Sequence, residues 1–365
     1  MSGSAAGPVE PLAEGRGRRL KVRPERLREL SLLAVIGVSV LVFSRLVDNY
    51  LSGSFFNRVT TSMAITAVLA AAQTLVILTR NIDLSVGSIV GVSAYLTGEY
   101  LAGHQSTAPL AAVVLAMLIG CGLGLLNGTL VAYGRVPAII VTLGTLAIYR
   151  TWLIDHAKAR TITADSLPRW LVDFPQATVA SLGELDIRLV LAVAVLVILV
   201  LQAALGRLRW GRWVYAVGSS PDAARQEGLP VQRITLGAFA MCGALSGLAG
   251  FMFLSRFGTI TVAAGQGLEL AAVAAAVVGG VSILGGSGTL VGALLGALLI
   301  DTLEQSLVRV PEVSEFWRDA VLGALILLAI AGDFAIGKRL RRLWTSSSRR
   351  RPPEAAPEQG VRADG

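Results

Sequence analysis

The stretch from Leu270 to Ile300 reads LAAVAAAVVGGVSILGGSGTLVGALLGALLI and carries no charged residue. A helix needs about 20 apolar residues to cross the hydrocarbon core of a bilayer, so this stretch is too long for one ordinary span. The cluster Gly285-Gly286-Ser287-Gly288 marks a natural break within it. The stretch therefore predicts two rather short membrane helices, over 268–284 and 288–304.

The composition of the whole chain agrees with a membrane protein. Of its 365 residues, 54% are hydrophobic and 15% are charged, and the mean hydropathy is +0.66. Soluble domains usually carry about 25% charged residues. Forty glycines accompany few aromatic residues, and small residues let membrane helices approach one another closely. We therefore predict an all-α fold, a polytopic bundle of membrane-spanning helices.

Working outward from the decisive stretch, apolar segments of suitable length recur along the chain. They predict ten membrane-spanning helices, over 30–47, 59–79, 83–102, 108–132, 137–154, 188–205, 233–254, 268–284, 288–304 and 316–336. Eight or twelve spans remain alternatives if a glycine-rich segment re-enters the membrane or splits.

Charge patterning sets the expected orientation. Basic residues cluster at both ends of the chain, with seven between Arg16 and Arg28 and eight between Lys338 and Arg362. Cytoplasmic segments of membrane proteins carry such an excess. We expect 1–28 to be a disordered basic cytoplasmic tail, 29–337 to be the membrane domain and 338–365 to be a second basic cytoplasmic tail. These tails lack interleaved aromatic residues, which argues against a nucleic-acid partner.

Ten spans also sort the internal loops by charge. The loop 206–232, with the adjoining Arg233, falls on the cytoplasmic side and is rich in arginine. The loop 155–187 falls outside, and its acidic residues outnumber its basic ones. An odd number of spans would break this pattern, so both termini are predicted to be cytoplasmic.

An inverted internal repeat is possible. Ile82-Asp83-Leu84-Ser85 precedes one apolar run, and Leu268-Glu269-Leu270 precedes another. Each run is followed by a similar pattern, which ends in Arg135-Val136-Pro137 in the first and Arg309-Val310-Pro311 in the second. In the predicted topology the two copies run in opposite directions, as inverted repeats of transporters do.

The cytoplasmic loop contains a short helix signal. Ser220 suits the N-cap, Pro221 the first helical position, and Gly228 the C-terminal stop. A helix of about two turns is too short to be stable alone in water. We therefore expect it to dock on another molecule or on the rest of the chain.

From about residue 55 to 335, the chain resembles the permease subunits of ATP-binding-cassette importers for monosaccharides, the ribose, rhamnose, xylose and autoinducer type. The motifs that carry the resemblance are the cytoplasmic loop together with Asn81-Ile82-Asp83-Leu84-Ser85-Val86-Gly87-Ser88, Gly124-Leu125-Leu126-Asn127-Gly128, the run from Val136 to Thr145, and the run from Ala275 to Gly288. Such family members usually carry a second glycine where this chain has Asn81.

The resemblance implies a transport machine with separate parts. This chain would form the translocation pathway in a bacterial cell membrane together with a second permease subunit, and an external binding protein would deliver a monosaccharide. Cytoplasmic ATPase subunits would use ATP, and this chain would hold no cofactor. The resemblance also implies a coupling helix that seats in the ATPase, formed here by Ser220, Pro221, Asp222, Ala223, Ala224, Arg225, Gln226, Glu227 and Gly228.

Polar residues on otherwise apolar helices are candidates for the translocation path. A monosaccharide needs hydrogen-bond partners, and ionisable residues inside a membrane are functional candidates by default. On these grounds we select Asp83, Asn127, Thr142, Thr145 and Glu269. The alternative role for the uncharged ones is hydrogen bonding between helices. No catalytic constellation and no metal-ligand spacing occurs in the sequence, which argues against an enzyme.

Three alternatives stay open. A permease of the same superfamily for nucleosides or branched-chain amino acids shares much of the motif set. An ion-coupled secondary transporter would work without an ATPase, although buried acidic residues are few. A membrane-embedded enzyme is the least supported alternative, because no catalytic set is present.

Overall fold

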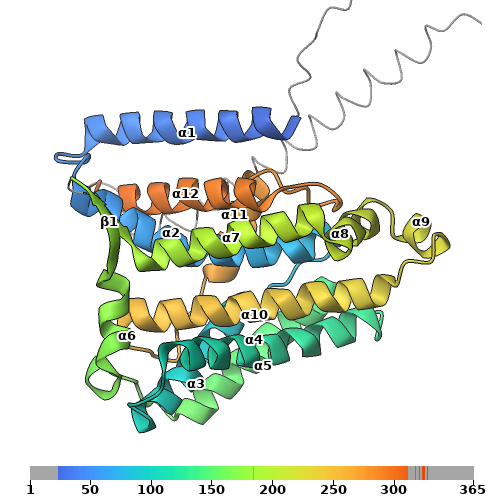
Figure 1. Ribbon diagram of the computed structural model, residues 1–365, viewed down its shortest axis with the longest axis horizontal. Coiled ribbons are helices and arrows are strands. Elements are labelled where there is room, and N and C mark those ends of the chain that lie inside the picture. The colour runs from blue at the N-terminus through green and yellow to red at the C-terminus, as the bar shows by residue number, and fades with distance from the viewer. Residues whose placement is uncertain are drawn as a thin grey trace, which may run out of the picture.

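The computed structural model in Figure 1 describes residues 24–183 and 185–310, together with residues 317, 320, 323, 324 and 327. Long helices dominate these residues. They are α1 (Pro24–Leu46), α2 (Gly53–Leu78), α3 (Val86–Gly103), α4 (Pro109–Ala132), α5 (Ala138–Ala157), α7 (Leu189–Arg207), α10 (Val231–Phe257), α11 (Leu268–Val278) and α12 (Leu290–Leu307).

The predicted fold class is confirmed. Nine of the ten predicted spans coincide with these helices, and the tenth, 316–336, lies outside the continuously described residues. Seven described helices are long and apolar enough to cross a membrane. Helix α1 begins at Pro24, inside the segment expected to be disordered, because proline suits the first position of a helix. Residues 1–23, the rest of that segment, lie outside the description, as does the C-terminal tail.

Two predicted spans are shorter as helices than expected. The segment 83–102 becomes helical only at Val86, and the segment 268–284 stops being helical after Val278. With 11 residues, α11 is about 16 Å long, roughly half the thickness of the hydrocarbon core. Glycines explain its early end, because Gly280, Gly285 and Gly286 all adopt positive φ, which side chains disfavour.

The long helices lie side by side in two groups (Figure 1). Helices α1, α12, α2 and α7 form one group, and α10, α4, α3 and α5 form the other. Helix α2 contacts both α12 and α10, and nearly all its side chains are buried. It is therefore the central helix of the bundle.

A seam of glycines joins α4 to α10. Gly120 packs against Gly243 and Gly247, and Gly124 packs against Phe239 and Gly243. Residue numbers increase along α4 in the direction in which they decrease along α10, so the two helices are antiparallel. A Cβ atom on any of these glycines would clash with backbone atoms of the facing helix. The seam therefore depends on the absence of side chains.

The bundle has two distinct ends. At one end, on the right in Figure 1, lie α8 (Arg209–Ser219) and α9 (Pro221–Gln226), which we call the α9 end. The opposite end carries the loop 158–188, with α6 (Arg169–Asp173) and a hairpin of β1 (Thr178–Leu182) and β2 (Leu185–Arg188). The strands pair antiparallel, with Thr178 opposite Arg188. These small elements add to the predicted all-α architecture without changing it.

We predict that the substitution Gly243→Ala lowers the free energy of unfolding by about 1–3 kcal/mol, because the new methyl group overpacks the seam. The control is Gly122→Ala on α4, where a Cβ would meet nothing within 4 Å. Alanine also favours helix over glycine, so the control is expected to be neutral or stabilising. Thermal unfolding of the detergent-solubilised protein, followed by size-exclusion chromatography, compares the two. Equal loss in both variants would contradict the seam.

Candidate functional site

Two helices begin in the middle of the bundle, where their N-terminal ends meet. Helix α3 runs parallel to α10, with Gly250 of α10 against Val90 and Ala94 of α3, and so starts level with the second half of α10. The start of α11 lies against the start of α3, because Gly87 is in close contact with Gly265 and the Glu269 carboxylate. A side chain at Gly87 would clash with both. The starts of α3 and α11 therefore form one junction.

The segment 79–85, which leads into α3, is held by a buried polar cluster. The Asp83 Oδ1 atom accepts hydrogen bonds from the Ser85 N–H and hydroxyl, at 2.9 and 2.7 Å. Asn127 Nδ2 donates to Ser85 Oγ at 2.7 Å and lies 3.5 Å from Asp83 Oδ2. The Tyr149 hydroxyl donates to Asn127 Oδ1 at 3.1 Å. Asp83 and Asn127 are fully buried, so this cluster ties α4 and α5 to the start of α3.

Other side chains satisfy the backbone of the same segment. The Thr142 hydroxyl donates to the Ile82 carbonyl at 3.3 Å. The Gln73 amide of α2 faces the backbone of Asp83. Its nitrogen donates to the Asp83 carbonyl at 3.2 Å, and its oxygen accepts from the Asp83 N–H at 3.1 Å. Thr142 and Gln73 thus satisfy backbone groups that have no helical hydrogen-bond partner in this segment. The Thr145 hydroxyl donates to the Thr142 carbonyl at 3.4 Å, within its own helix.

The loop 258–267, which leads into α11, is held by Arg150 of α5. Its Nη1 atom donates to the carbonyls of Val262 and Ala264, at 2.9 and 2.7 Å. An isolated bridge between Ile162 and Ile260 fixes the other part of this loop. Arg150 is half-buried, and a guanidinium group stays protonated in proteins. Arg150 is therefore a cation near the starts of α3 and α11.

A cavity of about 350 Å³ opens beside this junction. We call it the junction cavity. Its lining combines both charges with neutral polar groups and comprises Ser88, Leu146, Arg150, Ile154, Val262, Ala263, Gln266 and Glu269. The Glu269 Oε1 atom accepts from the Gly267 N–H at 3.3 Å, whereas Oε2 has no partner among the described residues. Donors and acceptors side by side suit a ligand rich in hydroxyl groups.

A second polar cavity, of about 370 Å³, lies on the other side of the loop 258–267. Gln266 lines both cavities. Asp301 of α12 and Arg256 of α10 line the second one, together with Ser62 and Thr66 of α2. Asp301 is almost completely buried, and one of its oxygens has no hydrogen-bond partner among the residues described. The loop 258–267 therefore separates two polar spaces.

Helix α9 is formed and docked as its sequence predicts. The Ser220 hydroxyl accepts from the Ala223 N–H at 3.3 Å, which is the expected N-cap. Ala224 is the buried residue of the helix, and Gly228 ends the turn that follows with φ of 76°. The remaining face, with Asp222, Ala223, Arg225, Gln226 and Glu227, is exposed. That face is free to meet another protein.

Helix α8, which the sequence analysis did not identify, links α9 to the centre of the bundle. Gly218 packs directly on the Leu78 carbonyl at the end of α2, and the Gly286 N–H donates to the same carbonyl at 3.1 Å. Arg80 donates to the carbonyls of Gly218 and Ser219, each at 2.6 Å. The α8–α9 pair is thereby fastened to α2 and to the loop 279–289.

The structure brings four of the five predicted path residues together, since Asp83, Asn127, Thr142 and Thr145 surround the segment 79–85. Glu269 lies apart from them, at the junction cavity. Sequence reasoning did not select Ser88, Arg150 or Gln266 as cavity residues. A cation within an apolar run was the available signal for Arg150.

Comparison with known proteins gives one family. Residues 55–330 match the family described as the permease component of branched-chain amino acid transport systems. The autoinducer 2 import system permease protein LsrC of Yersinia enterocolitica is 35% identical over 343 residues, which cover 92% of this chain and 89% of that protein. The corresponding protein of Yersinia pseudotuberculosis is 37% identical over 305 residues, covering 83% and 82%. No solved structure matches the chain.

The buried cluster makes a stability prediction. Asn127→Ala is expected to lower the free energy of unfolding by about 1–3 kcal/mol, because Asp83, Ser85 and Tyr149 lose a buried partner. The matched control is Thr129→Ala on the same helix, whose hydroxyl is exposed and bonds only to its own helix. That control should change stability by less than about 0.5 kcal/mol. Thermal unfolding measures both, and a mild effect at Asn127 would contradict the role assigned to the cluster.

Proposed function

The chain belongs to the family of permease components of branched-chain amino acid transport systems, and from this premise we propose that it carries a small sugar-like molecule into a bacterial cell. As the membrane-spanning permease subunit of an ATP-binding-cassette importer, it is a transport protein and not an enzyme. Such a subunit works with an ATPase and a binding protein.

The observation that carries the choice of cargo is the junction cavity. Arg150 supplies N–H donors, the Glu269 carboxylate supplies an acceptor oxygen, and Gln266 can do both. A hydroxyl group both donates and accepts, so it can satisfy all three side chains. A volume of about 350 Å³ is within the range of small-molecule sites. The relatives named above import autoinducer 2, and we extend cargo of that sugar-like kind to this chain.

We propose that the α9 end faces the cytoplasm. Its loops and helix ends are rich in arginine, and the acidic residues described there are fewer, namely Glu29, Asp222 and Glu227. The arginines are Arg80, Arg135, Arg207, Arg209, Arg212, Arg225 and Arg233. Basic excess marks cytoplasmic loops. This orientation puts both termini in the cytoplasm if the chain has the ten predicted spans.

In this proposal ATP acts only through the partner subunits. The exposed face of α9 seats in the ATPase, and α8 passes its movement to the Leu78 end of α2. The segment 79–85 and the junction follow directly from there in the chain. A second permease subunit completes the pathway, and the binding protein delivers cargo at the end opposite α9. The junction cavity thus opens alternately to the two sides.

A branched-chain amino acid is the second candidate cargo. The description of the family favours it, and the junction cavity offers opposite charges, Arg150 and Glu269, for the carboxylate and ammonium groups of a zwitterion. A sugar-like molecule fits this lining better, because four of its eight residues are polar, namely Ser88, Arg150, Gln266 and Glu269. Leu146, Ile154 and Val262 are its only larger apolar residues.

Transport by the reconstituted complex tests the cargo site. In proteoliposomes that contain the permease, its ATPase and its binding protein, Glu269→Gln and Arg150→Gln are each expected to reduce ATP-driven uptake of labelled autoinducer 2 roughly 10- to 100-fold. Loss of a charged hydrogen-bond partner has about this effect. The control Asp165→Asn removes an exposed carboxylate from the same end of the bundle and should leave uptake unchanged.

Competition by unlabelled leucine identifies the second candidate, and an unlabelled nucleoside serves as a further competitor. Uptake that leucine blocks, and that autoinducer 2 and ribose do not, would overturn the sugar-like cargo. Full uptake by both junction variants would overturn the cargo site.

The coupling role of α9 has its own test. Ala223→Trp places a bulky side chain on the exposed face of α9, and it is expected to prevent co-purification of the ATPase. The matched control is Leu208→Trp, at an exposed position of the same end outside α9. Undiminished ATPase binding by Ala223→Trp would contradict docking through α9.

A further inference from the structure

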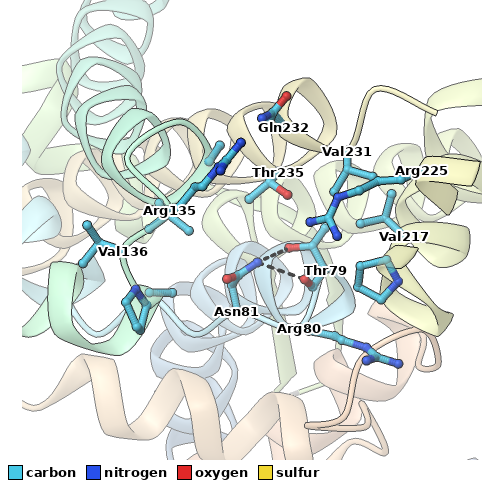
Figure 2. Close-up of a pocket in the computed structure, with 15 residues that line it drawn as sticks. Thr79, Arg80, Asn81, Arg135, Val136, Val217, Arg225, Val231, Gln232 and Thr235 are labelled. Atoms are coloured by element: carbon cyan, nitrogen blue, oxygen red, sulfur yellow. Dashed lines mark hydrogen bonds between the residues drawn. The ribbon is translucent and has the colours of Figure 1, made fainter. Parts of the chain in front are cut away.

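A larger pocket lies at the α9 end, away from the junction cavity. Its volume is about 680 Å³, and it is enclosed by the ends of α2, α4, α5, α9 and α10 (Figure 2). We call it the arginine pocket, because three arginines line it, namely Arg80, Arg135 and Arg225. Arg225 also belongs to the face of α9 that meets the ATPase in the proposed function, whereas the cargo site does not use this space.

The pocket is positively charged. Figure 2 shows Arg135 and Arg225 entering from opposite sides, with Thr235 between them. Arg80 lies in the wall and donates to the carbonyls of Gly218 and Ser219. No acidic side chain lines the pocket within the described part of the chain. One carboxylate, that of Asp222, accepts from Arg225 at 2.8 Å outside the lining and offsets a single charge.

Helix ends add to this field. Helix α5 begins at Ala138 and α10 begins at Val231, and both residues line the pocket. The first N–H groups of a helix have no partner within it, and the N-terminal end of a helix carries partial positive charge. Two long helices and three arginines therefore direct positive potential into one space.

Two of the arginines occupy strained backbone positions. Arg80 has φ of 67° and Arg135 has φ of 57°, in the left-handed region that favours glycine. Among the described residues only five other than glycine have positive φ, and two of these five line this pocket. An arginine at such a position brings a cation into the pocket at some cost in backbone energy.

The rest of the lining indicates what accompanies the negative charge. Thr79, Asn81, Gln232 and Thr235 offer neutral polar groups, and Val131, Val136, Val217 and Val231 provide apolar walls. The volume of about 680 Å³ is much larger than a lone phosphate ion needs and within the range of small-molecule sites. An organic phosphate matches this combination of charge, polar groups and space.

We propose that the arginine pocket binds a phosphate ester, with the phosphate between Arg135 and Arg225 and the organic part against the neutral wall. A ligand there contacts α9 through Pro221 and Arg225, and contacts α5 and α10 from the other side. It therefore ties the coupling helix to the bundle and regulates transport from the α9 end. The phosphate comes either from a soluble sugar phosphate or from an anionic lipid headgroup.

Binding is tested on the full-length permease in nanodiscs of phosphatidylcholine. Ribose 5-phosphate is the soluble probe, with ribose as its uncharged control, and short-chain phosphatidylglycerol is the lipid probe. We expect saturable binding of at least one phosphate probe in calorimetric titration, weakened by added salt, and none of ribose. Preference for one probe identifies the source of the phosphate. This readout needs no transport, so it is independent of the proposed cargo.

The variants separate charge from folding. Arg135→Gln should weaken binding by roughly tenfold or more. Arg135→Gly should do the same while it folds at least as well, because glycine suits the left-handed backbone. Arg209→Gln, an exposed arginine of the same end outside the pocket, should bind like the unchanged protein. The proposal would be overturned if neither phosphate probe binds, if Arg135→Gly binds as tightly as the unchanged protein, or if Arg209→Gln loses as much affinity as Arg135→Gln.

Discussion

Inside a bilayer every backbone N–H and C=O group needs a partner from the protein itself, and this requirement shapes the centre of the molecule. The segments 79–85, 258–267 and 279–289 are not helical although they join buried helices. Side chains from other helices supply the missing hydrogen bonds. Arg150 holds the segment 258–267, the Tyr215 hydroxyl of α8 donates to the Gly288 carbonyl in 279–289, and the Asp83–Asn127 cluster fixes 79–85. Charged and polar residues within this apolar chain thus serve first to hold interrupted backbone in place.

The same requirement explains why polar space exists where the starts of α3 and α11 meet. Helices α3 and α11 begin within the bundle, and at their junction Gly87 leaves room for the Glu269 carboxylate. An uninterrupted pair of helices would have filled this volume with apolar side chains. The proposed cargo site, the junction cavity, is therefore a consequence of the interruption. The contact of Gly218 with Leu78 connects this region to α9 through α2, which is the mechanical basis of the proposed coupling.

The sequence predicted much of the fold because membrane spans and helix caps are local signals. The N-cap at Ser220 and the interruption of the apolar stretch at Gly285 to Gly288 can each be predicted from a few neighbouring residues. The late start of α3 was not predictable in this way, because it depends on Asn127, Tyr149 and Gln73, which lie far away in the chain. Arg150 was not selected as a site residue for the same reason. Its partners are backbone carbonyls more than a hundred residues later in the chain. Every residue type has a backbone carbonyl, so the sequence does not show which carbonyls lack a donor.

The central claim is that, in the absence of ATP, the junction cavity opens on the side of the membrane opposite the α9 end. Labelling of single cysteines with a membrane-impermeant thiol reagent tests it most directly, after Cys121 and Cys242 are replaced. The account predicts that Gln266→Cys reacts only in right-side-out vesicles and that Gln232→Cys reacts only in inside-out vesicles, since both positions are exposed at their respective cavities. Reaction of both positions from the same side would contradict it.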